Sequence, residues 1–353
     1  MDSEIQSLIK VWFAAVVSMI YCYYIAARLP GGATRLLSLL PVFYLFTTLP
    51  LHLTSIHIGA ITIFYIVWLG NFKLLLFSFD QAPLYATPPL SLLHFISTAL
   101  LPIKTKHTPS CQSFSNSKFY LQLLAFALKV ALLAIIVRIY EYREYVHPYI
   151  ILALYYCHFY LAVELILAIT AVPVRVILGL DLEPQFNEPY LATSLQDFWG
   201  WRWNLMVSSV LRSTVYHPVR RISTRILGSR WARPPATMAT FLVSGLMHEV
   251  IYYYLSRAYP TWEVTWFFVL HGACVTVETA VKKALGGRWQ LHRLVSGPMT
   301  VAFVGVTGVW LFLPQLIRAF IWDHQGLVFA ASAAQIAGGF KVKAGEALAL
   351  CKA

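Results

Sequence analysis

The sequence predicts an all-α polytopic membrane protein, with eight or nine transmembrane helices around a central chamber. Hydrophobic residues make up 59% of the 353 residues and charged residues only 12%. A soluble domain typically carries about 25% charged residues. Apolar stretches of roughly 20 residues, the length that crosses a bilayer as a helix, recur along most of the chain. The composition therefore excludes an ordinary soluble fold.

The expected spans follow from these apolar stretches. A shorter piece, Leu90–Ile103, follows the Pro88–Pro89 pair and has Pro102 at its end. It is too short for a full crossing, so we expect a re-entrant or half helix there. The spans cover residues 8–28, 34–51, 56–79, 119–140, 148–172, 236–257, 261–285 and 295–322.

Basic residues gather in three segments, and these predict the orientation. They are the loop after the short piece, residues 202–233 and residues 282–293. The positive-inside rule places all three on the cytosolic side. The connection 141–147, on the opposite side, has little positive excess. The five cysteines form no CxxC pair and no spacing typical of metal ligands, so we expect no metal site.

Residues 173–235 form the one long stretch without a clean span. Ser194, followed three residues later by Asp197, is typical of a capping box. We expect a helix from this point until Pro218 stops it after His217. The segment as a whole is predicted to be cytosolic or interfacial, with this helix half-buried in the cytosolic leaflet.

The predicted interfacial helix carries the sequence DFWGWRWN. Asn204 shares a helical stripe with Gly200, and glycine permits close approach of a ligand. The amide of Asn204 both donates and accepts hydrogen bonds. The alternative is an aromatic belt at headgroup level, formed by Trp199, Trp201 and Trp203.

Residues 198–235 contain seven arginines and no Asp, Glu or Lys. Guanidinium groups bind phosphate through paired hydrogen bonds, so this set suits a phosphate-bearing ligand such as coenzyme A. A nucleic-acid partner does not fit so embedded a surface. The alternative assigns the charges to lipid headgroups and topology. The candidate contacts are Arg202, Arg212, Arg220, Arg221 and Arg225.

His248 lies near the middle of the span 236–257. Ionisable residues inside a spanning helix are costly and usually face a protein interior or a water-filled cavity. Ser244 and Gly245, one turn earlier, leave space beside the imidazole, and Tyr252 shares this face. The alternative is a histidine that only bonds a neighbouring helix. His271 lies inside the next span and is a candidate for the cavity wall or for packing.

These motifs resemble the membrane-bound O-acyltransferase superfamily, in which an Asn- or Asp-bearing motif precedes an intramembrane histidine. More narrowly, SLQDFWGWRWNLMV, SGLMHE and VLHGACVTVE resemble the plant wax synthases, which are long-chain-alcohol O-fatty-acyltransferases. The resemblance covers nearly the whole chain, 1–353, and implies one catalytic domain. Relatives often read FWGRRWN where this chain has Trp201, so the resemblance carries no coenzyme A contact to that position.

The resemblance also implies roles. His248 would act as general base on an acceptor hydroxyl, and Asn204 would polarise or orient the reacting groups. Acyl-CoA would be a co-substrate, with no permanently bound cofactor, and a long-chain fatty alcohol would be the acceptor. The implied location is the endoplasmic reticulum membrane, with the catalytic loop facing the cytosol. The expected tunnel residues are Trp199, Trp203, Ser244, Tyr252 and His271.

Two alternatives stay open at this stage. The acceptor could instead be diacylglycerol or a sterol, because a few side chains in an apolar tunnel decide chain preference. A multi-pass transporter with an intramembrane histidine is the alternative from another class. The sequence lacks an HxxxD acyltransferase motif, a GxSxG elbow, a P-loop and HExxH, which excludes the enzymes defined by those motifs.

Overall fold

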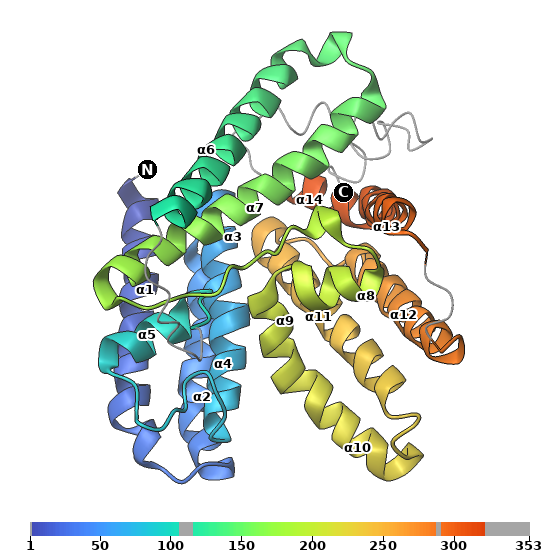
Figure 1. Cartoon of the computed structure of the whole chain (residues 1–353). Coiled ribbons are helices and arrows are strands. Elements are labelled where there is room, and N and C mark those ends of the chain that lie inside the picture. The colour runs from blue at the N-terminus through green and yellow to red at the C-terminus, as the bar shows by residue number, and fades with distance from the viewer. Residues whose placement is uncertain (1, 106–115, 287–290, 322–353) are drawn as a thin grey trace.

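The computed structural model describes residues 2–105, 116–286 and 291–321. Most of these residues are helical (Figure 1), and their one isolated β-bridge joins Thr105 to Leu182. The expected all-α class is therefore confirmed.

The first five helices form one group (Figure 1). Its core joins apolar side chains such as Met19, Leu39 and Phe95. The helix that begins at α3 continues through a π-helical segment, η3, into α4. The short helix α5 has nine residues and is about 14 Å long, as expected for a half helix. The bounds are α1 (Asp2–Tyr24), α2 (Ala33–Thr48), α3 (Ile56–Ile63), η3 (Phe64–Gly70), α4 (Asn71–Ser78) and α5 (Leu92–Leu100).

Helices α6 (Asn116–Ile139) and α7 (Pro148–Leu178) pack side by side as a long hairpin (Figure 1). The expected end of this span at residue 172 is wrong. Helix α7 continues through Pro173 and ends where Gly179 adopts a left-handed conformation, with φ of 63°. Glycine adopts that conformation without the steric cost that a Cβ adds.

From Leu195 onward the interfacial segment contains two consecutive helices, separated at Asn204, instead of the single helix that we expected. Ser194 caps the first one as predicted, since its hydroxyl accepts a hydrogen bond from the Asp197 amide at 3.1 Å. The first helix breaks at Asn204, and the second runs through η7 and past Pro218 to Leu227, so the expected end after His217 is wrong. The elements are α8 (Leu195–Asp197), η6 (Phe198–Arg202), α9 (Leu205–Leu211), η7 (Arg212–Tyr216) and α10 (His217–Leu227).

The C-terminal group surrounds α11 (Arg233–Ser256), the helix that carries His248. Seven helices are long and apolar enough to cross a membrane among the residues described. Helix α11 is not one of them, because His248, Glu249 and its tyrosines lower its mean hydropathy. The end of the expected span 295–322 falls outside the described residues. The remaining elements are α12 (Glu263–Ala284), α13 (Arg293–Thr307), η8 (Gly308–Phe312) and α14 (Leu313–Ile321).

Glycines bring α11 and α12 close together. A Cβ at Gly245 would lie 2.9 Å from Thr265 Cα, and a Cβ at Gly272 would lie 2.9 Å from Phe241 Cβ. Real Cβ atoms are essentially never found so close to another carbon atom, so each helix contributes a glycine that its partner requires. This contact fixes the two helices that carry His248 and His271.

We expect Gly245→Ala to destabilise the protein by about 1–3 kcal/mol, because the added methyl meets backbone and overpacks the interface. Gly305→Ala is the matched control. A Cβ at Gly305, also within a helix, has no described heavy atom within 4 Å, and alanine is the better helix former. Thermal unfolding in detergent checks both variants, and equal midpoints would contradict the close-contact role of Gly245.

Candidate active site

One large cavity lies between the helix groups. Its volume is about 2070 Å³, whereas ordinary small-ligand sites reach about 1,000 Å³. Side chains from α3, η3, α7, η6, α9, α11, α12 and α14 contribute to its wall. Most of the wall is aromatic or aliphatic, as an acyl chain requires. The cavity is the chamber that the sequence predicts.

His248 lines this cavity and is only half-buried. Its Nδ1 lies 2.7 Å from the Ser244 carbonyl oxygen. A carbonyl only accepts, so Nδ1 carries the proton and donates it to Ser244. Nε2 therefore keeps its lone pair. The ring also stacks on Phe268, with centroids 4.5 Å apart. The fold thus presents a histidine in the tautomer that a general base needs.

Asn204 lines the same cavity from the break between η6 and α9. Its φ of 36° is left-handed, which asparagine tolerates better than most residues. Its Oδ1 accepts a hydrogen bond from the Val207 amide at 3.2 Å and so caps α9. Because the oxygen is used in the cap, the Nδ2 amide protons are the groups that a substrate can engage.

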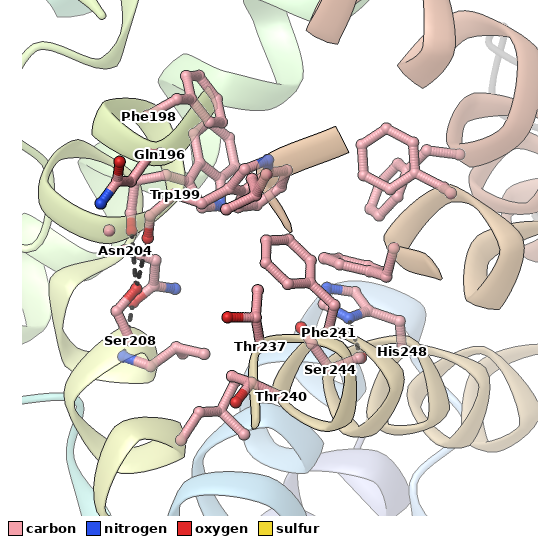
Figure 2. A pocket seen from close by; sticks show the side chains of 18 of the residues that line it. Gln196, Phe198, Trp199, Asn204, Ser208, Thr237, Thr240, Phe241, Ser244 and His248 are labelled. Atoms are coloured by element: carbon pink, nitrogen blue, oxygen red, sulfur yellow. Dashed lines mark hydrogen bonds between the residues drawn. The ribbon is translucent and has the colours of Figure 1, made fainter. Parts of the chain in front are cut away.

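Figure 2 shows His248 and Asn204 on opposite sides of the opening, with Thr237 and Phe241 between them. Both side chains line the same cavity. The cavity therefore separates the two side chains instead of bringing them into direct contact.

The structure divides the five predicted arginines. Arg212 and Arg220 line the cavity. The lining does not include Arg202, whose guanidinium pairs with Asp197 at 2.8 Å. Arg221 and Arg225 are exposed on α10, away from the cavity wall.

Four basic residues that we did not assign also line the cavity. Two follow α10 and two lie in the last turn of α12. The described part of the lining contains no Asp or Glu, so the cations create a positive rim. Their signal was present in the sequence as two basic loops, but only the fold shows that both loops reach one cavity. The four residues are Arg230, Arg233, Lys282 and Lys283.

The predicted tunnel residues also divide. Trp199, Trp203, Ser244 and Tyr252 line the cavity. His271 does not, since it is 0% exposed and bonded to neighbouring side chains.

Glu249, next to His248, joins three helices. Its Oε1 accepts from the Thr265 amide at 3.2 Å, and its Oε2 accepts from Gln315 Nε2 at 3.3 Å. The carboxylate is buried and is satisfied by polar groups of α12 and α14. It therefore holds the His248 helix in place. Among the described residues no cluster of three His, Cys, Asp or Glu side chains forms a candidate metal site.

All four π-helical segments in the described part of the chain supply residues to the cavity. They include Trp68 from η3, Trp199 from η6, Arg212 from η7 and Phe312 from η8. A π turn shifts the register of a helix and is frequent at functional sites. Trp68 and Phe312 pack around His248, with ring centroids 5.0 and 5.7 Å away. The hydropathy pattern gave no signal for these shifts.

The comparisons with known proteins agree with this geometry. The model of the membrane bound O-acyl transferase family matches residues 182–270, which contain Asn204 and His248. The chain is 54% identical to a long-chain-alcohol O-fatty-acyltransferase of Simmondsia chinensis, over 90% of this chain and 91% of the relative. It is 50% identical to probable long-chain-alcohol O-fatty-acyltransferase 1 of Arabidopsis thaliana, over 90% and 93%. An acyl-CoA–sterol O-acyltransferase of Arabidopsis thaliana is 44% identical over 88% and 91%.

These identities extend over nearly the full length of each relative, so the likeness is not confined to the apolar helices. The chain belongs to the membrane bound O-acyl transferase family, within its group of plant long-chain-alcohol O-fatty-acyltransferases.

Proposed function

We propose that this protein transfers a fatty acyl group from acyl-CoA to the hydroxyl of a long-chain alcohol, which makes a wax ester. The observation that carries the proposal is the single cavity. It joins a base-competent histidine, an asparagine with free amide protons, apolar walls and a positive rim. Family membership supports a transferase rather than the transporter that the sequence left open.

In the proposed reaction Nε2 of His248 removes the proton of the alcohol hydroxyl. The alkoxide oxygen attacks the thioester carbon, the carbon–sulfur bond breaks, and the imidazolium returns the proton to the coenzyme A thiolate. No acyl-enzyme is needed, because the thioester is already activated and the cavity brings the two substrates together. General-base help of this kind is worth about 10²–10⁴-fold.

Asn204 has a different role in this scheme. It lies across the cavity from His248 (Figure 2), on the side of the η6–α9 break. In this assignment its Nδ2 donates a hydrogen bond to an oxygen of acyl-CoA, which orients the thioester toward His248. This assignment keeps proton transfer on one side of the cavity and donor binding on the other.

The positive rim is the proposed site for the phosphates of coenzyme A. Arg220 reaches it from α10, and Arg230, Arg233 and Lys283 complete it. The pattern of exposure on α10 separates Arg220 from its neighbours Arg221 and Arg225, which lie away from the cavity. The revised set of residues proposed to bind coenzyme A therefore comprises Arg212 and Arg220, the two arginines that follow α10, and the two lysines that end α12.

We expect Gln at Arg220, Arg230, Arg233 and Lys283 together to raise the KM for acyl-CoA at least about tenfold. Each lost hydrogen bond to a charged group is worth about 1.5–3 kcal/mol. The salt dependence of KM should fall as well. The matched control is Arg221→Gln with Arg225→Gln, which removes charge from the same helix outside the cavity. An equal rise of KM in the control would contradict the rim assignment.

The acceptor is proposed to occupy the apolar end of the cavity. Phe159 and Val163 of α7 and Leu316 of α14 line this part, and α7 is among the helices able to cross a membrane. A lipid alcohol can therefore enter from the bilayer while the donor enters at the basic rim. A sterol is the second candidate acceptor, because one relative is an acyl-CoA–sterol O-acyltransferase.

The test is a matrix of acyl-CoA donors and acceptors, supplied to the purified protein in lipid nanodiscs. Release of free coenzyme A together with wax ester, and no sterol ester or triacylglycerol, is the expected result. If sterol ester is the main product, the acceptor is a sterol and not a long-chain alcohol. Uptake without coenzyme A release would reject the transferase reading.

We further propose that the protein acts as one domain in the endoplasmic reticulum membrane, with the basic rim facing the cytosol. Elements from α3 to α14 share the cavity wall, which supports one domain. Intact microsomes should then use added acyl-CoA, which does not cross the bilayer, as fast as detergent-permeabilised ones. Activity that appears only after permeabilisation would reverse the orientation.

A further inference from the structure

His271 lies behind the cavity wall, where three elements meet. Its Nδ1 is 2.9 Å from Trp199 Nε1 in η6, and its Nε2 is 2.8 Å from Thr307 Oγ1 at the end of α13. The side chain itself belongs to α12 and has no exposed surface. Both ring nitrogens are therefore engaged with neighbouring side chains.

The chemistry of these partners fixes the proton on His271. An indole N–H can only donate, so Nδ1 is the acceptor for Trp199. The proton is then on Nε2, which donates to Thr307. The Thr307 hydroxyl in turn donates to the Phe303 carbonyl at 2.7 Å. Every donor in this series of hydrogen bonds points the same way, and neither ring nitrogen of His271 keeps a free lone pair. His271 cannot serve as a base while these hydrogen bonds are intact.

Trp199 connects this chain to the cavity. Its indole lines the wall. It packs edge-on against Phe241, at 5.8 Å between centroids, and in a tilted arrangement against Phe268, at 5.7 Å. Phe268 is the ring on which His248 stacks. The position of the Trp199 indole therefore sets the position of the surface against which the His248 imidazole lies.

Glu278, two turns after His271 on the same side of α12, holds the beginning of this segment. Its Oε2 accepts from the Leu195 amide at 2.9 Å and from the Gln196 amide at 3.3 Å. Ser208 closes the other end by donating to the Trp199 carbonyl at 3.0 Å (Figure 2). Among these contacts, the bond to His271 is the one that fixes the indole ring itself.

We propose that His271 is a positioning residue, which orients Trp199 and through it the ring contacts of His248. The inference rests on the proposed function for its effect on turnover. It does not rest on that function for its effect on His248, which can be measured without substrate. A misplacement of about 1 Å near reacting groups can cost about 10²-fold in rate.

The test compares His271→Leu with His271→Asn. Leucine removes the acceptor for the Trp199 N–H, whereas the carboxamide oxygen of asparagine can replace Nδ1. We expect His271→Leu to lower kcat about 10- to 100-fold, with a smaller change in both KM values, and His271→Asn to restore most of the loss. Trp199→Phe removes the donor from the other side, so it should match His271→Leu. The double variant should be no worse than either single variant, because both remove one interaction.

A second measurement needs no turnover. Carbethoxylation of His248 by diethyl pyrocarbonate, resolved by peptide mass spectrometry, reports access to its Nε2. The rate should rise in His271→Leu and in Trp199→Phe and stay near the wild-type rate in His271→Asn. Equal rates in all four proteins, or additive losses of kcat in the double variant, would overturn the positioning role. A wild-type protein that makes no ester would reject the proposed function, while the labelling result would still decide the inference.

Discussion

His248→Ala should lower ester formation by about 10²–10⁴-fold, the usual worth of general-base catalysis. The protein should still fold, because the side chain is half-buried at a cavity and its hydrogen bond goes to the Ser244 carbonyl of its own helix. The KM values for acyl-CoA and alcohol should change far less, because the imidazole accepts the hydroxyl proton during the chemical step and contributes little to substrate binding. Initial rates in nanodiscs, with size-exclusion profiles for folding, measure both effects.

His158→Ala is the matched control for this prediction. His158 also lines the cavity and also lies on a long apolar helix, α7. Its Nδ1 lies 3.4 Å from the hydroxyl of Tyr140, in the connection between α6 and α7, and its ring stacks on the Tyr140 ring. Its replacement should leave kcat close to wild type. If both variants lose the same activity, the loss does not depend on which cavity histidine is replaced, and the assignment of the base to His248 is wrong.

The sequence predicts the helices of this protein well because long apolar runs in lipid have few alternatives to helix. The bounds of α2 and α12 fall within a few residues of the expected spans. The errors lie where a local signal competes with packing. Pro173 marks a break in isolation, but in α7 the helix passes through it. The helix also passes through Pro218, which directly follows the π-helical segment η7, where the regular α-helical hydrogen-bond register is already interrupted.

The site was predictable in its residue types and not in its geometry. His248 interrupts a long apolar segment and Asn204 ends a tryptophan-rich motif, so the sequence alone singled out both residues. Periodicity gave no means to predict that Asn204 would interrupt a helix with a positive φ, because the pattern assumes regular helix on both sides. The arginines show the same limit. Arg220 and Arg221 are neighbours in sequence, but only the first reaches the cavity.

Asn204→Asp should separate the two roles of this residue. The aspartate keeps an oxygen that accepts the Val207 amide, and Asp is as good a helix cap as Asn. It loses the amide protons and adds a negative charge where the proposed reaction places the thioester of acyl-CoA. We expect near-normal thermal stability and a loss of kcat/KM of about 10² or more, as with removal of one preorganised hydrogen-bond donor.

Asn204→Ala provides the comparison, because it removes the cap and the amide together. The loss of the cap costs about 1 kcal/mol, and alanine is strained at a φ of 36°. This variant should therefore lose both stability and activity. If the aspartate variant keeps its activity while the alanine variant does not, Asn204 matters only because it begins α9. If the aspartate variant loses activity at full stability, the amide protons act on the substrate, and the break in the helix exists to present them.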